Sequence, residues 1–323
     1  MDGDASGVLD RVARGIGGME AVERLAALNG SDFASVMLEV VRRRAARETP
    51  ASVLRRYRHD RFVRPGSTSW RSGRQAEDIL LGCLPADVEV VTLAPLVPLG
   101  THSALGTVSQ HKIVTAIRAC EVAADPTNAL ALEAAVRRMS PAHGTVRLAA
   151  AQRVVRAQRF PAGWSAHFGL FAMVTAGRDE GSCRFEQGVL AEQLRFAVAG
   201  LRAAELPRVQ VALTPLSEAG ERIAVAAAAE LAATSADTVI DRDRVAGHGY
   251  YRDVCFKVNA LVNNTPAEIG DGGFTDWTAR LLASKKERLL ISGYGLDRLA
   301  ALIDGQGLAA DAAQAGSASP DRP

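Results

Sequence analysis

Two consecutive apolar stretches separated by a turn constrain the fold of this chain more than any other feature. Residues 146–156 and 167–175 have the β-branched and apolar composition of strands, and Pro161-Ala162-Gly163 lies between them. A short connection of this kind joins antiparallel strands, because a parallel pair requires a long crossover. We therefore expect an antiparallel hairpin in the middle of the chain.

Strand-like and helix-like segments alternate on both sides of this hairpin. Asp125-Pro126 places a helix N-cap before a proline in the first turn, and basic residues end this helix at Arg138. Helices inserted between hairpin-connected strands predict an α+β fold, with a mostly antiparallel sheet flanked by helices. The other expected strands are 88–93, 209–213, 254–262 and a partner near 289–291, and the other expected helices are about 187–204 and 217–233.

Residues 1–75 are expected to form a helical, arginine-rich extension. The stretch from Arg42 to Arg74 contains eleven arginines but only two acidic residues, with Tyr57, Phe62 and Trp70 among them. This composition is typical of a surface that contacts RNA or phosphate groups. The interpretation that we favour is the solvated face of an extension packed on the main domain, and contact with RNA stays open as the alternative.

Composition limits the partners, the cellular compartment and the cofactors that we expect for this protein. The net charge of +2 favours neither acidic nor basic partners, and four scattered cysteines without a C-x-x-C pattern indicate a reducing compartment. The chain shows no signal peptide and no long uncharged apolar run, so we expect a cytoplasmic protein without membrane contact. The six histidines lack metal-ligand spacing, so we expect no resident metal. After a core at 76–305, the Ala-, Gly- and Ser-rich residues 306–323 are expected to be disordered.

Two segments carry recognisable chemistry. Residues 155–168 read V-R-A-Q-R-F-P-A-G-W-S-A-H-F, and residues 293–299 read G-Y-G-L-D-R-L. They resemble motifs 2 and 3 of the class II aminoacyl-tRNA synthetases, in the branch of histidyl-tRNA synthetase and the ATP phosphoribosyltransferase regulatory subunit. Residues 249–257, Gly272 to Asp276, and Pro95 match further family segments in the same order. The resemblance covers roughly 76–305 and implies the class II synthetase core.

The resemblance also implies roles for particular residues in an ATP site. Arg156 would hold the α-phosphate, Arg298 the γ-phosphate, and Phe168 would stack on adenine. Gln158 would accept from the adenine amino group. Further implied residues are Gly293 and Gly295 beside the nucleotide, and Asp125, Thr127, Tyr250, Tyr251, Gly272 and Gly273 for the substrate.

These assignments have alternatives in the residues alone. Because 34 of the 38 basic residues are arginine, an arginine here indicates function only in an unusual local setting. Arg156 is otherwise a strand arginine paired with an acid, Arg298 a surface helix arginine, and Phe168 a core residue. The family also implies Mg²⁺ as the ion that accompanies ATP, and a homodimer.

The chain departs from the family in several places. Gln158 replaces the motif 2 glutamate, residues 125–128 replace the R-P-E-x-T segment, and four positions lack an arginine. Trp164, Ala166, Ala246 and Phe274 stand where the family places arginine, with Arg244 close to one of them, and no anticodon-binding domain of ordinary size follows Ile303. We therefore expect an ATP-dependent ligase-like paralogue. It would activate an amino acid or related carboxylate as an adenylate, for a small acceptor or carrier rather than tRNA. The alternatives are a non-catalytic regulatory paralogue that binds an enzyme partner, and an RNA-directed role.

Overall fold

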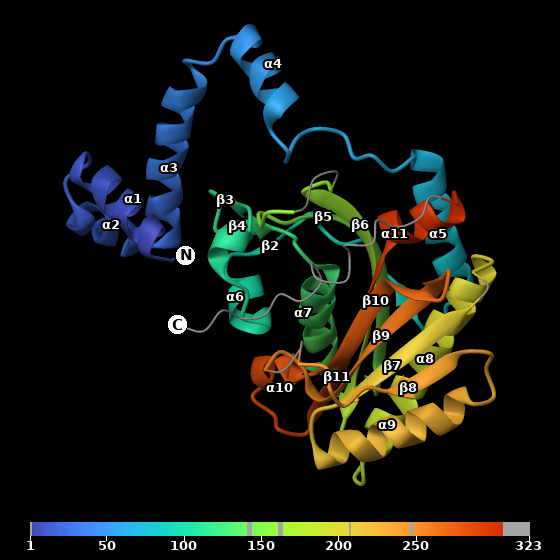
Figure 1. The fold of residues 1–323 in the computed structure, drawn as a ribbon. Helices are drawn as coiled ribbons and strands as arrows, with labels where there is room; N and C mark the ends of the chain where they lie inside the picture. The colour runs from blue at the N-terminus through green and yellow to red at the C-terminus, as the bar shows by residue number, and fades with distance from the viewer. Residues whose placement is uncertain (1, 141–143, 161–163, 207, 246–248, 306–323) are drawn as a thin grey trace.

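The computed structural model describes residues 2–140, 144–160, 164–206, 208–245 and 249–305 (Figure 1). Within these residues an eight-stranded sheet has the order β1-β5-β6-β11-β10-β9-β7-β8. All neighbouring pairs are antiparallel except β1 with β5 and β7 with β8, so the predicted α+β class is confirmed. The strands are β1 (Glu89–Val90), β5 (Val146–Val155), β6 (His167–Arg178), β7 (Val209–Pro215), β8 (Asp237–Ile240), β9 (Arg252–Val262), β10 (Thr265–Thr275) and β11 (Glu287–Gly295).

Helices cover both faces of this sheet (Figure 1). On one face, Leu194 of α8 and Ile223 of α9 join a core with Phe171 and Tyr294. On the other face, Leu130 of α7 packs in a second core of buried side chains. The helices of the body are α5 (Trp70–Gly82), α6 (Thr101–Gly106), α7 (Pro126–Arg138), α8 (Arg184–Ala203), α9 (Glu218–Leu231), α10 (Trp277–Leu281) and α11 (Leu296–Ile303), with a 3₁₀ turn η1 (Gln110–Lys112).

A small second sheet lies beside α6 and has the order β2-β4-β3. Its strands are β2 (Leu96–Pro98), β3 (Thr115–Ala116) and β4 (Cys120–Val122), and both pairs are antiparallel. The strand expected at 88–93 is shorter than its composition suggested. Only Glu89 and Val90 form β1, and the chain then leaves the sheet before Pro95.

The central hairpin is confirmed, with β5 and β6 paired antiparallel from Val146↔Ala176 to Val155↔His167. Its expected turn at 161–163 lies outside the described residues. The second expected strand pair is wrong in one respect: β10 lies between β9 and β11, so β9 and β11 are not neighbours. Asn263 and Asn264, with φ of 50° and 61°, make the two-residue turn from β9 into β10. Asparagine tolerates this left-handed conformation, which suits a tight hairpin.

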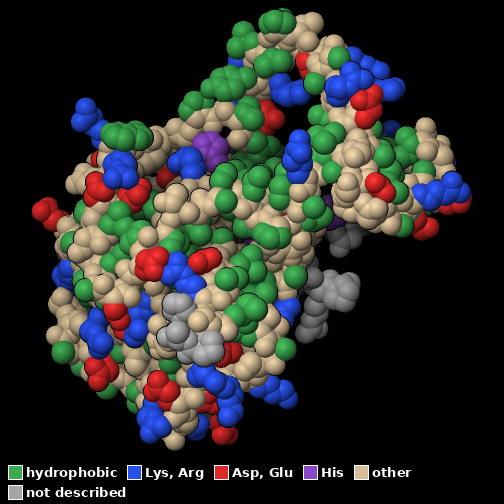
Figure 2. Space-filling view, turned by 180° about the vertical axis from the view of Figure 1, so that it is seen from behind, with side chains coloured by type: hydrophobic (Ala, Val, Ile, Leu, Met, Phe, Trp, Pro, Cys, Tyr) green, Lys and Arg blue, Asp and Glu red, His purple; other side chains and the backbone are tan. Residues whose placement is uncertain are grey.

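The extension forms four exposed helices that project from the body as an arm (Figure 1). These are α1 (Asp2–Arg14), α2 (Met19–Ala26), α3 (Gly30–Ala45) and α4 (Pro50–His59), and the last three bury no residue. Figure 2 shows hydrophobic and arginine side chains exposed together on this arm.

Helix α5 belongs to the body rather than to the arm. Ala76 and Leu80 of α5 are fully buried, and Ser72 donates to Asp304 at the end of α11 over 2.9 Å. The expected domain boundary between residues 75 and 76 therefore falls inside a packed helix. The tail expected at 306–323 lies outside the described residues. None of the helices in the described chain has the length and apolar composition needed to cross a bilayer.

Candidate functional site

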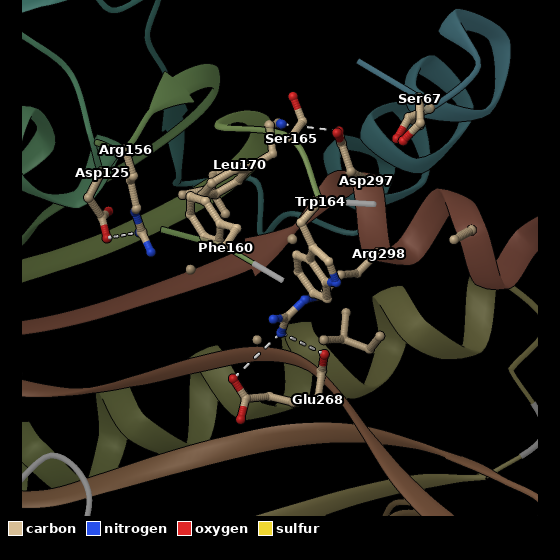
Figure 3. A pocket seen from close by; sticks show the side chains of 18 of the residues that line it. Ser67, Asp125, Arg156, Phe160, Trp164, Ser165, Leu170, Glu268, Asp297 and Arg298 are labelled. Carbon is tan, nitrogen blue, oxygen red and sulfur yellow. Dashed lines mark hydrogen bonds and ion pairs between the residues drawn. The ribbon is translucent and has the colours of Figure 1, made fainter. Parts of the chain in front are cut away.

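A cavity of about 430 Å³ opens where the β5–β6 hairpin meets β10, β11 and the start of α11 (Figure 3). This volume is in the range of small-molecule sites. Its wall contains charged, polar and aromatic side chains. Seven of the residues implied by the family resemblance line it: Asp125, Arg156, Gln158, Phe168, Gly293, Gly295 and Arg298.

Arg156 forms the first cationic wall of the cavity. Its Nε donates to the carbonyl of Ala124 over 2.9 Å, and its Nη2 lies 3.3 Å from Oδ2 of Asp125. The guanidinium is 5.2 Å from the centre of the Phe168 ring, in cation–π range. Arg156 is therefore paired with an acid, as one interpretation of the sequence expected, and it also lines the cavity, as the other expected.

Arg298 forms the second cationic wall, at the start of α11. Its guanidinium lies 5.2 Å from the centre of the Trp164 ring, and Nη1 donates to the carbonyl of Glu268 over 3.1 Å. The Glu268 carboxylate is 3.7 Å from Arg298 and 2.7 Å from Nζ of Lys257. Figure 3 shows Arg298 and Glu268 on the opposite side of the cavity from Arg156 and Asp125. Trp164, which stands where the family has an arginine, thus supplies an aromatic face to another arginine.

Close packing joins motif 3 to the start of β6. Asp297 accepts a 3.0 Å hydrogen bond from the backbone N–H of Gly169, and a Cβ at Gly169 would lie 3.2 Å from Asp297 and Leu296. Arg153 lies 3.6 Å from the other Asp297 oxygen. The glycine therefore lets α11 approach the strand closely, which fixes where Arg298 enters the cavity.

Five implied residues do not line the cavity, although they lie near it. Thr127 is buried and bonds Asp125 through both its amide and its hydroxyl, so it holds the N-cap of α7. Tyr250 packs edge-on against Tyr251. A Cβ at Gly272 would lie 2.5 Å from Phe256, and one at Gly273 would lie 2.6 Å from Tyr251. These glycines therefore serve sheet packing, and Phe274, which is 2% exposed, belongs to the core.

Asp271 on β10 lines the cavity and was not anticipated from the sequence. The Tyr251 hydroxyl donates to it over 3.0 Å. Burial and the neighbouring Glu268 charge raise the pKa of Asp271 to about 6, against the opposing effects of Arg244 and the Tyr251 hydrogen bond. The signal in the sequence is a lone acid among three glycines, Gly270, Gly272 and Gly273.

A β-bulge explains how β10 presents two acids to one cavity. Glu268 and Asp271 are three residues apart and would face opposite sides of a regular strand. The pairing of β10 with β9 shifts register between Glu268 and Gly270, so Ile269 is an extra residue. Ile269 is buried in the core that contains Phe171 and Tyr294, although it also borders the cavity, and both carboxylates line the cavity.

A segment of the extension, residues 61–69, also reaches the site, and we call it the strap. Arg61 donates to the carbonyls of Ala157 and Gln158, and the Arg64 carbonyl lies 2.6 Å from Nε2 of His167. A Cβ at Gly66 would lie 2.4 Å from Arg153. These contacts hold the strap against the hairpin, where Ser67, Thr68 and Ser69 line the cavity.

A buried imidazole and carboxylate support the Arg156 wall from behind. His102 of α6 and Glu121 of β4 are 1% and 0% exposed, and Nδ1 of His102 lies 2.6 Å from Glu121. Nε2 of His102 accepts from the Ala124 amide over 3.0 Å. Because an amide only donates, His102 is the neutral tautomer with its proton on Nδ1. Burial raises the pKa of Glu121, but hydrogen bonds, led by the His102 amide, leave it below its usual value.

The other departures from the family have plain structural outcomes. Ala166 is 1% exposed, and its carbonyl accepts from the Arg156 amide over 2.9 Å, so it belongs to the hairpin rather than to the cavity wall. Ala246 lies outside the described residues. Within the described chain, no group of three or more His, Cys, Asp or Glu side chains is arranged to hold a metal ion.

Comparisons with known proteins place the fold. No protein-family model and no curated protein sequence matches the chain. Solved structures do match, among them an ATP phosphoribosyltransferase regulatory subunit/histidyl-tRNA synthetase from Bacillus halodurans C. That match has a TM-score of 0.59 and 12% identity, over 75% of this chain and 83% of the other.

Two histidyl-tRNA synthetases give similar agreement. The enzyme from Nostoc sp. PCC 7120 has a TM-score of 0.57 and 12% identity, over 77% of this chain and 76% of its own. The apo enzyme from S. aureus has a TM-score of 0.54 and 15% identity, over 74% and 67%. The class II synthetase-like fold expected from the motifs is therefore confirmed.

Proposed function

We propose that this protein is an ATP-dependent, adenylate-forming enzyme that activates an amino acid or related carboxylate for transfer to a small acceptor or carrier. One observation carries the proposal. Two arginines, each against an aromatic ring, face one cavity from opposite sides: Arg156 with Phe168, and Arg298 with Trp164. This arrangement suits a ligand that combines phosphate groups with a flat ring.

Each residue then has a distinct role in adenylate formation. A carboxylate oxygen of the substrate attacks the α-phosphorus, the bond to the bridging oxygen breaks, and pyrophosphate leaves. Arg156 would neutralise charge that develops on the α-phosphate, and Arg298 would hold the γ-phosphate. Both arginines now contact carboxylates, so phosphate oxygens would replace Asp125 and Glu268 as their partners.

The adenine site is supported by two residues of the hairpin. Phe168 packs edge-on against Phe160, with ring centres 6.1 Å apart, which fixes the plane that it offers to a base. Gln158 lines the same cavity, and its carboxamide oxygen would accept from the adenine amino group.

Mg²⁺ would arrive with the phosphates of ATP. Magnesium keeps several waters and takes few protein carboxylates in such sites. Glu268 lies beside Arg298, and it would hold the ion by giving up its pairing with Lys257. When bound, the ion would neutralise the charge of the leaving pyrophosphate.

The strap supports a small acceptor rather than a tRNA end. Ser67, Thr68 and Ser69 border the cavity, and Arg61 anchors the strap to the hairpin loop. An acceptor must therefore fit a site that part of the chain already borders. The partners that we propose are a small acceptor or carrier and a second copy of the chain.

The arm gives weaker support to contact with RNA. Arg42 and Arg43 pair with Glu39, and Arg56 pairs with Glu48. Arg74 of the same run pairs with Glu77 and Asp78. Four of the eleven arginines that suggested RNA binding are therefore paired with acids within the described chain.

A regulatory paralogue remains a second candidate, supported by a specific observation. Phe274, where the family has an arginine, is a core residue and supplies no charge to the site. Such a protein would bind a small ligand and an enzyme partner without turning over ATP.

Amino-acid-dependent exchange of labelled pyrophosphate into ATP separates the two candidates. The proposal expects exchange with at least one amino acid or related carboxylate, and its loss in Arg156→Ala. Exchange that is absent, or unaffected by Arg156→Ala, contradicts the adenylation assignment. Arg195→Ala on α8 is a matched control, since in the described chain Arg195 is half exposed and pairs with exposed Glu230.

A further inference from the structure

Asp271 differs from the other carboxylates of the cavity in its partners. Asp125 pairs with Arg156 at 3.3 Å, Glu268 with Lys257 at 2.7 Å, and Asp297 with Arg153 at 3.6 Å. Asp304, the fifth, is exposed to solvent. In the described chain, Asp271 takes part in no ion pair, and its one hydrogen bond comes from Tyr251. A partly buried carboxylate without a cation partner is costly unless a ligand supplies the charge.

The space beside Asp271 is open and belongs to the cavity. Asp271 stands opposite Gly293 in the pairing of β10 with β11, and both residues line the cavity. A Cβ at Gly293 would have no atom within 4 Å. Side chains of directly opposite residues lie side by side on one face of a sheet. A ligand group therefore has room next to this carboxylate, where a side chain would otherwise stand.

The Asp271 carboxylate selects the kind of group that fits beside it. Burial is the largest cause of the raised pKa of Asp271, and the charges of Glu268 and Asp125 add to it. The Arg244 charge and the Tyr251 hydrogen bond act in the opposite direction. Lys257, directly opposite Asp271 on β9, pairs with Glu268. An anionic group would meet repulsion from the Asp271 carboxylate, while a positively charged nitrogen would find a hydrogen-bond acceptor of opposite charge.

We propose that Asp271 binds a positively charged nitrogen group of the substrate in the space beside Gly293, so that the activated carboxylic acid carries an amine. This inference rests on the proposed function only for the activation of the carboxylate, since binding of the amine is independent of ATP. The charged nitrogen comes either from an α-amino group or from a basic side chain. Asp271 would accept its hydrogen bond, and Arg156 would lie on the far side with the nucleotide phosphate.

Calorimetric titration of the full chain at pH 8 tests the inference with matched probes. Lysine, ornithine and arginine carry both amines, norleucine and citrulline lack the basic side chain, and hexanoate lacks both. At least one amine-bearing probe should bind at least tenfold more tightly than hexanoate. Tight binding of norleucine assigns the α-amino group, and binding restricted to basic amino acids assigns the side chain.

Variants locate the interaction at Asp271. Asp271→Asn should weaken the best probe about 10- to 100-fold, the range for a hydrogen bond to a charged group. Gly293→Val should abolish binding by filling the space, with its fold checked by circular dichroism. Asp237→Asn, an exposed acid on the edge strand β8, is the matched control.

Three results would overturn the inference: binding of no amine, equal binding of hexanoate, or unchanged binding in Asp271→Asn. Pyrophosphate exchange distinguishes this failure from that of the proposed function. Amine binding without exchange leaves the inference standing and contradicts adenylation. Exchange that occurs with an amine-free acid and is unchanged in Asp271→Asn supports adenylation and contradicts the inference.

Discussion

Arg156 and Asp125 are joined by two routes on one wall of the cavity. The side chains lie 3.3 Å apart, and Nε of Arg156 also donates to the carbonyl of Ala124, the residue before Asp125. The arginine expected to hold phosphate is therefore oriented by the same turn that caps α7. An incoming phosphate competes with the Asp125 carboxylate but not with the Ala124 carbonyl.

This competition predicts opposite effects of two substitutions on ATP binding. Arg156→Ala should weaken ATP about 10- to 100-fold, because a charge-assisted hydrogen bond is lost. Asp125→Asn should strengthen ATP several-fold, because the competing charge is gone while asparagine remains a good N-cap. Calorimetric titration measures both. Weaker ATP binding in Asp125→Asn would contradict the competition.

The motifs could be predicted from the sequence because they are local. Arg156 and Arg298 are carried by short segments whose strand, glycine and aromatic neighbours identify them. The presence of two acids of β10 in the cavity could not be predicted in this way. Glu268 and Asp271 share a face only because of the bulge at Ile269, which depends on the pairing with β9. Strand β10 itself was missed, although Asn263-Asn264 is a recognisable hairpin turn. The strap was missed because its anchors, Arg61 and Gln158, are far apart in the chain.

Asp271 predicts a pH-dependent stability that needs no ligand. Its pKa rises from the usual 3.8 to about 6 on folding, so the folded state binds more protons between these values. Stability therefore falls as the pH rises through about 4 to 6, and the cost is complete above 6. Asp271→Asn removes this cost and should stabilise the protein at pH 8 by on the order of 1–3 kcal/mol.

The comparison of two pH values checks the sign of this effect. Urea unfolding at pH 8 should give a larger free energy of unfolding for Asp271→Asn than for the wild-type chain. This difference should become smaller towards pH 4. An Asn variant that is less stable at pH 8 would show that the carboxylate is favourably paired in the fold. Asp237→Asn should give no such pH-dependent difference.

Arg61 is predicted to control the order of the strap. It donates to two backbone carbonyls of the hairpin, Ala157 and Gln158. Arg61→Ala should raise amide exchange in residues 61–69 by about tenfold or more, while exchange in the β5–β6 strands stays unchanged. Arg71→Ala is a control from the same basic run, on the exposed side of α5. Equal exchange in both variants would mean that the strap is held by other contacts.

His102 is predicted to act on the cavity from a distance, through the backbone of Ala124. Its Nε2 accepts from the Ala124 amide, and the Ala124 carbonyl accepts from Arg156. Nitrogen NMR of the imidazole should report a neutral ring with the proton on Nδ1. His102→Leu should destabilise the chain by about 1–3 kcal/mol, because the Ala124 amide and the Glu121 carboxylate each lose a buried partner.

The same variant should also weaken ATP binding, although His102 is not among the described residues that line the cavity. In the folded His102→Leu protein the Ala124 carbonyl is less firmly placed, so Arg156 loses orientation and ATP affinity should fall several-fold. Leu130→Ala, which leaves a void under α7 without touching this chain of hydrogen bonds, should lower stability by about 2–5 kcal/mol and leave ATP affinity nearly unchanged. If both variants weaken ATP equally, or if the proton lies on Nε2, His102 does no more than fill the core.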